Sequence, residues 1–143
     1  MRIMALGIHP DDVEIGCGGT VALCAASGDD VTIVDLTRGE SSTNGTPEER
    51  ALEAAEAARI LGGARRENAR IPDAGVQSEN ADQTRAVVSI IRAHRPDVVL
   101  IPNPDDPHPD HASGGILIQR AMFLSNVNGY VTERDGKRQE RWS

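Results

Sequence analysis

Aromatic residues, cysteines, long apolar runs and clustered positive charge are all scarce in this sequence. Aromatic residues make up 2% of the chain, and Phe123, Tyr130 and Trp142 all lie late in it, so nothing indicates a surface for stacking nucleic-acid bases. Cys17 and Cys24 cannot build a disulfide framework, because two cysteines seven residues apart on an expected helix are too distant for an ordinary bridge. We predict two reduced thiols.

Charge and hydropathy exclude two classes of partner. The net charge is −7 and the basic residues are scattered, which does not suit a nucleic-acid phosphate backbone. No apolar run approaches the roughly 18 residues of a membrane helix. Residues 1–8 resemble no secretory signal, since the apolar stretch is short and no small-residue cleavage site follows. We therefore expect a cytoplasmic protein with neither a nucleic-acid nor a membrane partner.

Short apolar segments alternate with longer amphipathic ones along the 143 residues. The pattern predicts strands over 2–8, 31–36 and 97–101 with a weak one at 69–71, and helices over 18–26, 47–61, 80–94 and 112–124. Such alternation is typical of right-handed βαβ units. We predict an α/β, Rossmann-like fold with a mostly parallel sheet, formed by a core over 1–124 and followed by a polar segment, 125–143, for which no element is predicted.

Three of the four histidines lie just past the ends of two predicted strands. The segments are His9-Pro10-Asp11-Asp12 and His108-Pro109-Asp110-His111. In a doubly wound sheet, the carboxyl ends of the strands line the ligand crevice where the strand order reverses. If the first and the 97–101 strands are neighbours, the two loops form one site.

Two histidines and one carboxylate are a ligand set that suits a catalytic Zn²⁺ and also accommodates Fe²⁺. The prolines fix the loop directions before metal arrives. Adjacent Asp11 and Asp12 point differently, so one can bind metal while the other accepts a proton. The alternative interpretation is that the aspartates cap helices and the histidines are exposed loop residues. We interpret His94 as a favourable charge at a helix C-terminus.

The segment Gly16-Cys17-Gly18-Gly19-Thr20 is a weak signal for a phosphate loop, because it matches neither the dinucleotide nor the Walker pattern. Its glycines are better explained by close packing of the first helix on the sheet, or by backbone approach near the metal loop. A Cys17 nucleophile beside His9 is conceivable, but thiol chemistry would not explain the second His/Asp loop.

The chain resembles the LmbE/PIG-L family of zinc-dependent N-deacetylases. The resemblance rests on His9-Pro10-Asp11-Asp12-Val13-Glu14 together with His108-Pro109-Asp110-His111. Segments between the two motifs, Asp35-Leu36-Thr37-Arg38-Gly39-Glu40 and Ala57-Ala58-Arg59-Ile60-Leu61-Gly62, look like the branch that deacetylates N-acetylglucosaminyl-malate in bacillithiol synthesis.

This resemblance implies a role for each site residue. His9, Asp12 and His111 would be the zinc ligands, and Asp11 the general base. His108 would be the acid or oxyanion-stabilising partner. Arg50 would bind an anionic substrate group such as malate, or would instead pair with Glu49 or Glu53 on its own helix. Glu14 matches the motif, with a supporting role.

The resemblance fades after Phe123, and members of the family are usually longer. We therefore expect the family's C-terminal strands to be missing, which would leave an open apolar sheet edge that favours homo-oligomers. The first hypothesis is a metal-dependent hydrolase that deacetylates a small N-acetylglucosamine conjugate. The alternatives are a truncated, non-catalytic metal- or sugar-binding domain, or a deacetylase of another N-acyl sugar.

Overall fold

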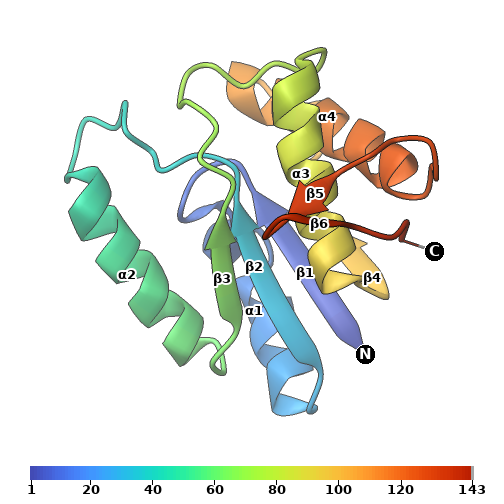
Figure 1. The fold of residues 1–143 in the computed structure, drawn as a ribbon. Helices are drawn as coiled ribbons and strands as arrows, with labels where there is room; N and C mark the ends of the chain where they lie inside the picture. Colours follow the sequence, from blue (N-terminus) through green and yellow to red (C-terminus); the bar gives the residue numbers. More distant parts are fainter. Residues whose placement is uncertain (143) are drawn as a thin grey trace.

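The computed structural model describes residues 1–142, which form a parallel sheet with helices on both faces (Figure 1). The elements follow one another as β1 (Arg2–Gly7), α1 (Asp12–Ala26), β2 (Asp30–Asp35), α2 (Pro47–Ile60), β3 (Arg65–Asn68), α3 (Ala81–His94), β4 (Val98–Leu100), α4 (Pro109–Ser125), β5 (Glu133–Arg134) and β6 (Lys137–Arg138). This architecture confirms the predicted α/β, Rossmann-like fold.

All strand pairs of the main sheet are parallel, and the strand order is β3-β2-β1-β4. The order reverses beside β1, because β2 pairs with one edge of β1 and β4 with the other, opposite Ile3, Met4 and Ala5. The predicted neighbourhood of the first strand and the 97–101 strand is thus confirmed. Within residues 1–142, β4 pairs with β1 alone, so its second edge is open.

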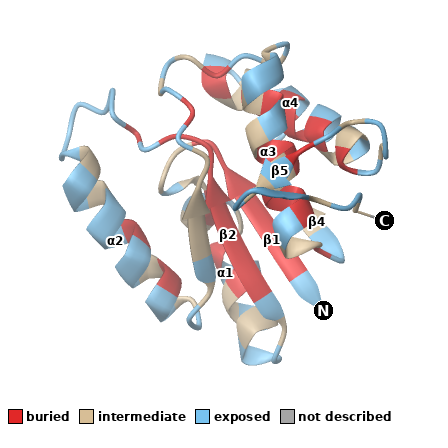
Figure 2. Cartoon of the chain, viewed as in Figure 1, coloured by how far each residue is buried: buried red, intermediate tan, exposed pale blue. Residues whose placement is uncertain are grey.

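Alternating side chains of β1 and β2 bury two separate apolar layers. Met4, Leu6 and Val34 face α3 and α4, whereas Ile3, Ala5 and Ile33 face α1 and α2. A central parallel strand is buried on both faces, which explains the nearly continuous apolar run at the start of the chain. Figure 2 shows the burial concentrated along β1 and β2 and on the inner sides of α3 and α4.

Two helices begin earlier than their predicted starts, and each brings a motif residue into its first turn. Helix α1 begins at Asp12 rather than at Gly18, with a kink at Cys17. The glycines weaken the helical signal there, since each costs about 1 kcal/mol relative to alanine. Helix α4 begins at Pro109 rather than at Ala112 and has His108 as its N-cap, so His111 is a helical residue and not a loop residue.

The weak strand was predicted in the wrong place, over 69–71. The strand is formed by Arg65–Asn68, whose polar residues carry no apolar pattern. Ala69 and Ile71 instead donate backbone hydrogen bonds to the carbonyls of Asp35 and Leu36, just beyond the end of β2.

Close packing of glycines occurs in α4, and not in α1 as we had expected. A Cβ on Gly114 would collide with Ile8 Cδ1, and one on Gly115 would lie 3.0 Å from the backbone of Pro104. A Cβ on Gly16 or Gly19 would meet no atom within 4 Å. Helix α4 therefore approaches the strand ends closely, which keeps the two histidine segments together.

The C-terminal segment folds back onto α3 and contains the small β5–β6 hairpin, although no element was predicted there. The buried Arg92 of α3 donates hydrogen bonds to five acceptors of this region, namely the carbonyls of Leu124, Ser125, Val127 and Tyr130 and the hydroxyl of Thr132. Burial lowers the pKa of Arg92. Four backbone carbonyls and one threonine hydroxyl thus serve as acceptors for one buried cation.

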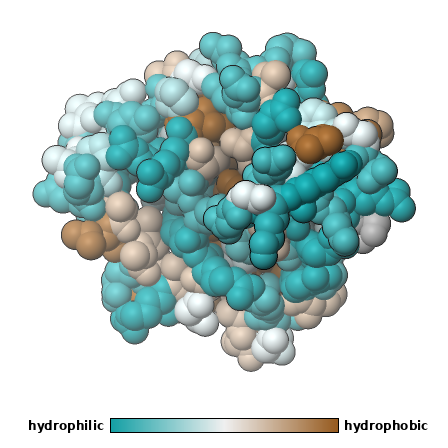
Figure 3. Space-filling model, in the orientation of Figure 1, coloured by the Kyte–Doolittle hydropathy of each residue, from teal (hydrophilic) through white to brown (hydrophobic). Residues whose placement is uncertain are grey.

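Hydrophilic side chains cover most of the face seen in Figure 3, and hydrophobic ones are exposed there only in separate patches. No helix among residues 1–142 is long and apolar enough to cross a membrane.

Candidate metal centre and active site

The two histidine segments meet at the C-terminal ends of β1 and β4, at the point where the strand order reverses. His9 lies two residues past β1, Asp12 opens α1, and His111 lies in the first turn of α4. Because β1 and β4 are adjacent and parallel, their C-terminal ends lie at the same edge of the sheet. This edge is the expected position for a ligand crevice in a doubly wound sheet.

His9, Asp12 and His111, here called the His–Asp cluster, bring three ligand atoms together. His111 Nε2 lies 3.3 Å from both His9 Nδ1 and Asp12 Oδ2, and His9 Nδ1 lies 3.7 Å from the same Asp12 oxygen. Ligands of tetrahedral zinc at 2.0–2.2 Å are separated from one another by about 3.3–3.6 Å. The chemistry and spacing of these three atoms therefore fit a tetrahedral divalent cation.

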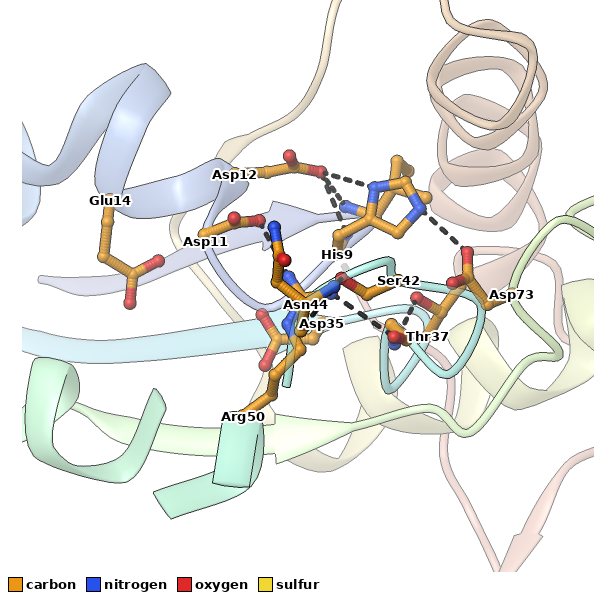
Figure 4. Close-up of polar contacts among 12 residues, drawn as sticks. His9, Asp11, Asp12, Glu14, Asp35, Thr37, Ser42, Asn44, Arg50 and Asp73 are labelled. Atoms are coloured by element: carbon orange, nitrogen blue, oxygen red, sulfur yellow. Dashed lines mark hydrogen bonds and ion pairs between the residues drawn. The ribbon is translucent and has the colours of Figure 1, made fainter. Parts of the chain in front are cut away.

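Asp12 is held in place by the backbone beside it. Its Oδ2 atom accepts hydrogen bonds from the backbone N–H groups of Ile8 and His9, at 2.8 and 2.9 Å. Figure 4 shows this carboxylate turned toward the His9 ring. The segment between β1 and α1 thus orients a metal-type ligand through its own main chain.

Each histidine of the cluster has a second carboxylate on its other ring nitrogen. His9 Nε2 lies 3.0 Å from Asp73 Oδ1, and His111 Nδ1 lies 3.4 Å from Asp106 Oδ2. Burial alone would raise the pKa of Asp73, but hydrogen bonds from the backbone of Ser41 and Ala74 and from His9 keep that pKa below its usual value. The pKa of Asp106 is lowered by the backbone N–H of His108 and by His111.

Two other groupings of possible metal ligands overlap with the His–Asp cluster. His9, His108 and His111 can bring one nitrogen each within 4.8 Å of one another, as can His9 with carboxylate oxygens of Asp73 and Asp110. Both groupings share His9. The second of them would use the carboxylates on the outer side of His9, whereas the His–Asp cluster uses Nδ1.

Asp11 and Arg50 form an ion pair beside the cluster. Arg50 Nη2 lies 3.3 Å from Asp11 Oδ1, and Arg50 Nη1 donates to the carbonyl of Gly39. The alternative pairing of Arg50 with Glu49 or Glu53 is not present among residues 1–142, and Glu49 instead accepts the backbone N–H of Thr46 in a capping box. Figure 4 shows Arg50 reaching from α2 toward Asp11.

Asp11 does not cap α1, contrary to the capping interpretation of the motif. It occupies the N-cap position, but its side chain makes no capping hydrogen bond and is 55% exposed. His108 does cap α4, since its Nδ1 accepts the backbone N–H of Asp110. Because Nδ1 acts as an acceptor, Nε2 is the ring nitrogen of neutral His108 that carries hydrogen.

Two clefts open beside the cluster. One, of about 430 Å³, is lined by polar groups that include His9, Ser41, Arg50, Asp73 and His108. The other, of about 570 Å³, lies along β4 and α1 and is bordered by Asp12, Asp106 and His111, with Cys17 in its wall. Burial raises the pKa of Cys17, which does not favour the thiolate that a nucleophile needs.

The sequence interpretation gave no role to three acidic residues of this region. Asp73 stands in a turn and carries no motif signal, so only the fold brings it to His9. Asp106 lies five residues before His111, and a carboxylate near a candidate metal histidine was a usable signal. Asp110 is 6% exposed, and its Oδ2 atom has no hydrogen-bond partner among the described residues.

A second charge cluster, here called the arginine cluster, consists of Glu14, Asp35 and Arg66. Arg66 donates to Asp35 at 2.7 and 2.8 Å and to Glu14, and it also reaches the carbonyl of Ala54. Burial raises the pKa of Asp35 although Arg66 opposes the shift. Burial alone would lower the pKa of Arg66, but hydrogen bonds to Asp35 and Glu14 outweigh it and raise that pKa. Glu14 of the first motif thus pairs with Arg66, outside the His–Asp cluster.

Fold and geometry together define an α/β protein with a His/Asp metal-type centre at the switch point of its sheet. The family model PIG-L, described as GlcNAc-PI de-N-acetylase, matches residues 4–122. The chain therefore belongs to the PIG-L family.

Curated relatives and a solved structure agree with this assignment. The chain is 33% identical over 139 residues to diacetylchitobiose deacetylase from Thermococcus kodakarensis, covering 90% of this chain and 52% of that protein. It is 33% identical over 164 residues to 1D-myo-inositol 2-acetamido-2-deoxy-alpha-D-glucopyranoside deacetylase 2 from Saccharopolyspora erythraea, covering 91% and 59%. The conserved protein TT1542 from Thermus thermophilus superposes with a TM-score of 0.87 and 42% identity, over 97% of this chain and 63% of that one.

The chain spans about half the length of the Thermococcus relative. A solved structure with the same fold is named for a different reaction. GalB, the 4-carboxy-2-hydroxymuconate hydratase from Pseudomonas putida, has a TM-score of 0.78 and 26% identity over 99% of this chain and 62% of that one. The fold alone therefore does not fix the reaction.

Proposed function

We propose that the chain is a metal-dependent N-deacetylase of a small N-acetylglucosamine conjugate. The observation that carries the proposal is the convergence of His9 Nδ1, Asp12 Oδ2 and His111 Nε2 within 3.3–3.7 Å beside a polar cleft. These residues would hold Zn²⁺ or Fe²⁺, since two histidines and one carboxylate suit both ions. Family membership and relatives named as deacetylases of acetamido sugars support this reaction.

When bound, the cation supplies Lewis acidity, which activates water at neutral pH and polarises the acetamide carbonyl. Asp11 is the base in this proposal, because its exposed carboxylate makes no capping hydrogen bond and stands one residue before Asp12. It accepts the proton of the attacking water. Arg50 fixes the direction of that carboxylate through their 3.3 Å ion pair.

His108 acts on the other side of the reacting amide. Its Nδ1 atom is engaged by the backbone of Asp110, so hydrogen is carried at Nε2. With that hydrogen, neutral His108 donates a hydrogen bond to the tetrahedral oxyanion, and the proton that Asp11 accepted from water passes to the leaving amine. The acetyl group leaves as acetate, and the sugar keeps a free amine.

The substrate would lie in the polar cleft beside Arg50, Asp73 and Ser41. A guanidinium has five N–H donors, so Arg50 retains donors for an anionic aglycone such as malate besides those that it gives to Asp11 and Gly39. The two curated relatives are named for chitobiose and myo-inositol conjugates. These conjugates are therefore the other substrates to test beside the malate conjugate.

The test is acetate release by the purified chain from N-acetylglucosaminyl-malate, the myo-inositol conjugate and diacetylchitobiose, with and without Zn²⁺ or Fe²⁺. We expect metal-dependent release from at least one conjugate. Replacing Asp11 by Asn should reduce turnover by about 10²–10⁴-fold with metal still bound, and His111→Ala should abolish both. Stoichiometric metal binding with no acetate from any conjugate would instead favour the metal- or sugar-binding domain.

We also propose self-association through the open edge of β4. Val98 on this strand is 39% exposed, and Ile15 on the adjoining helix α1 is 81% exposed. Open sheet edges with apolar side chains favour pairing with another chain. Sedimentation of the unmodified chain beside Val98→Lys tests this, with a lower association constant expected for the variant.

A further inference from the structure

The two histidines of the His–Asp cluster face its centre with different ring nitrogens. His9 turns Nδ1 inward and Nε2 toward Asp73, whereas His111 turns Nε2 inward and Nδ1 toward Asp106. A neutral imidazole carries hydrogen on one nitrogen and a lone pair on the other, and an ionised carboxylate can only accept. His9 Nε2 lies closer to Asp73, at 3.0 Å, than His9 Nδ1 lies to Asp12, at 3.7 Å. The nitrogens of His111 lie 3.3 Å from Asp12 and 3.4 Å from Asp106, but Asp12 Oδ2 already accepts two backbone N–H groups. The nitrogen that faces the outer carboxylate is therefore the one that carries hydrogen.

We propose that Asp73 and Asp106 are positioning residues that fix opposite tautomers of the two histidines, Nε2–H at His9 and Nδ1–H at His111. The inference rests on the proposed function in that it assigns the metal to the His–Asp cluster. With both hydrogens turned outward, the 3.3 Å contact between His9 Nδ1 and His111 Nε2 is a contact between two lone pairs. Both lone pairs and the Asp12 oxygen then point to one cation position.

Both carboxylates are themselves held by the backbone, so they can orient a ring. The Asp73 side chain is 8% exposed and accepts N–H groups from Ser41 and Ala74, each at 2.9 Å. Asp106 uses Oδ1 to accept the N–H of His108 at 2.8 Å, which leaves Oδ2 for His111. Asp106 thus contacts both His108, the N-cap of α4, and His111 in the first turn of that helix.

Asp106→Asn is a sharp test because asparagine keeps Oδ1 for His108 and presents an N–H group where Oδ2 stood. That N–H would face His111 Nδ1 and favour a lone pair there, which moves the ring hydrogen to Nε2 and blocks the inward position. Asp105→Asn is the matched control, since Asp105 is exposed in the same loop and, among residues 1–142, its side chain makes no hydrogen bond or ion pair.

The first readout is the tautomer of each histidine, measured from long-range ¹H–¹⁵N ring correlations in the metal-free chain at pH 8. We expect Nε2–H at His9 and Nδ1–H at His111 in the unmodified chain and in Asp105→Asn. Asp106→Asn should reverse His111 alone, and Asp73→Asn should alter His9 alone. The same tautomer at both histidines of the unmodified chain, or an unchanged His111 in Asp106→Asn, would overturn the proposal.

The second readout is Zn²⁺ affinity, measured by competition with a chromophoric chelator. Loss of a carboxylate behind a ligand histidine typically weakens binding about 10–100-fold, so we expect this loss in Asp73→Asn and in Asp106→Asn and no change in Asp105→Asn. Equal affinity of Asp106→Asn and Asp105→Asn would contradict the inference. If the unmodified chain binds Zn²⁺ with these dependences but releases no acetate, the proposed function fails and the inference stands.

Discussion

The His–Asp cluster and the arginine cluster lie near the same end of the sheet and differ in the charge at their centres. In the arginine cluster, the guanidinium of Arg66 stands between the carboxylates of Asp35 and Glu14. In the His–Asp cluster, two imidazole nitrogens and one carboxylate oxygen meet, with no arginine or lysine among them. The carboxylates of the arginine cluster are neutralised by a side chain of the protein itself. The ligand atoms of the His–Asp cluster instead suit a metal cation taken up from solution.

Helix α1 supplies one carboxylate to each cluster from its first turn. Asp12 and Glu14 are two residues apart, so they do not lie on the same helix face. Asp12 reaches His9 and His111, and Glu14 reaches Arg66. The arginine cluster therefore holds the start of α1 against β2 and β3, and in doing so it sets the position from which Asp12 enters the His–Asp cluster.

The largest expected effect is on stability, from removing the central cation of the arginine cluster. Arg66→Met leaves the buried Asp35 without its counter-charge, which typically costs about 3–5 kcal/mol. Arg65→Met is the control, since Arg65 forms an exposed pair with Asp30 worth about 1 kcal/mol or less. Urea unfolding of both variants measures the difference. Equal losses would mean that the arginine cluster does not stabilise the fold.

A smaller stabilisation is expected from filling the His–Asp cluster. Zn²⁺ at 100 times its dissociation constant should raise the free energy of unfolding by about 2.7 kcal/mol, because a ligand that binds only the folded state stabilises it. His111→Ala should lose this gain. His94→Ala, whose histidine pairs with Glu67 away from the cluster, should keep it. A gain that survives His111→Ala would assign the metal to other residues.

The smallest effect concerns a third, partly buried charge group, in which Glu67 lies between His94 and Arg134. The hydrogen bond from His94 lowers the pKa of Glu67, and Arg134 adds to this. A carboxyl whose pKa is lower in the folded state stabilises at pH values above its unfolded pKa, and this contribution is lost as pH falls through the folded value. Glu67→Gln should therefore cost about 0.5–1 kcal/mol at pH 7 and almost nothing near pH 3, in unfolding measured across that range. A cost that does not change with pH would exclude this linkage.

The sequence predicted the structure best where a motif of possible metal ligands follows a clear strand pattern. The apolar run of β1 and the run around β4 predicted two strands, and the His/Asp segments that follow them were predicted to meet if those strands were neighbours. This condition follows from the general arrangement of doubly wound sheets. The α/β class and the approach of His9 to His111 could therefore be derived without coordinates.

Contacts set by tertiary structure could not be predicted. Arg50 lies on a helix rich in glutamate, and local spacing favoured partners on that helix, yet the fold brings it to Asp11. Asp73 reaches His9 from 64 residues away, out of a turn with no motif. Strand β3 begins with Arg65 and Arg66, whose partners Asp30 and Asp35 belong to another strand. Each of these contacts depends on register, which hydropathy does not encode for polar strands.

The five acceptors of Arg92 also set an order of events during synthesis. They follow Arg92 by 32 to 40 residues, so at about 5–20 residues per second they are made about two to eight seconds after it. Until then, the guanidinium of Arg92 has none of these acceptors, although it lies on the face of α3 that is buried in the folded protein. A nascent chain that holds every residue from His9 to His111 therefore still lacks the acceptors in residues 124–132, which α3 needs for its native packing.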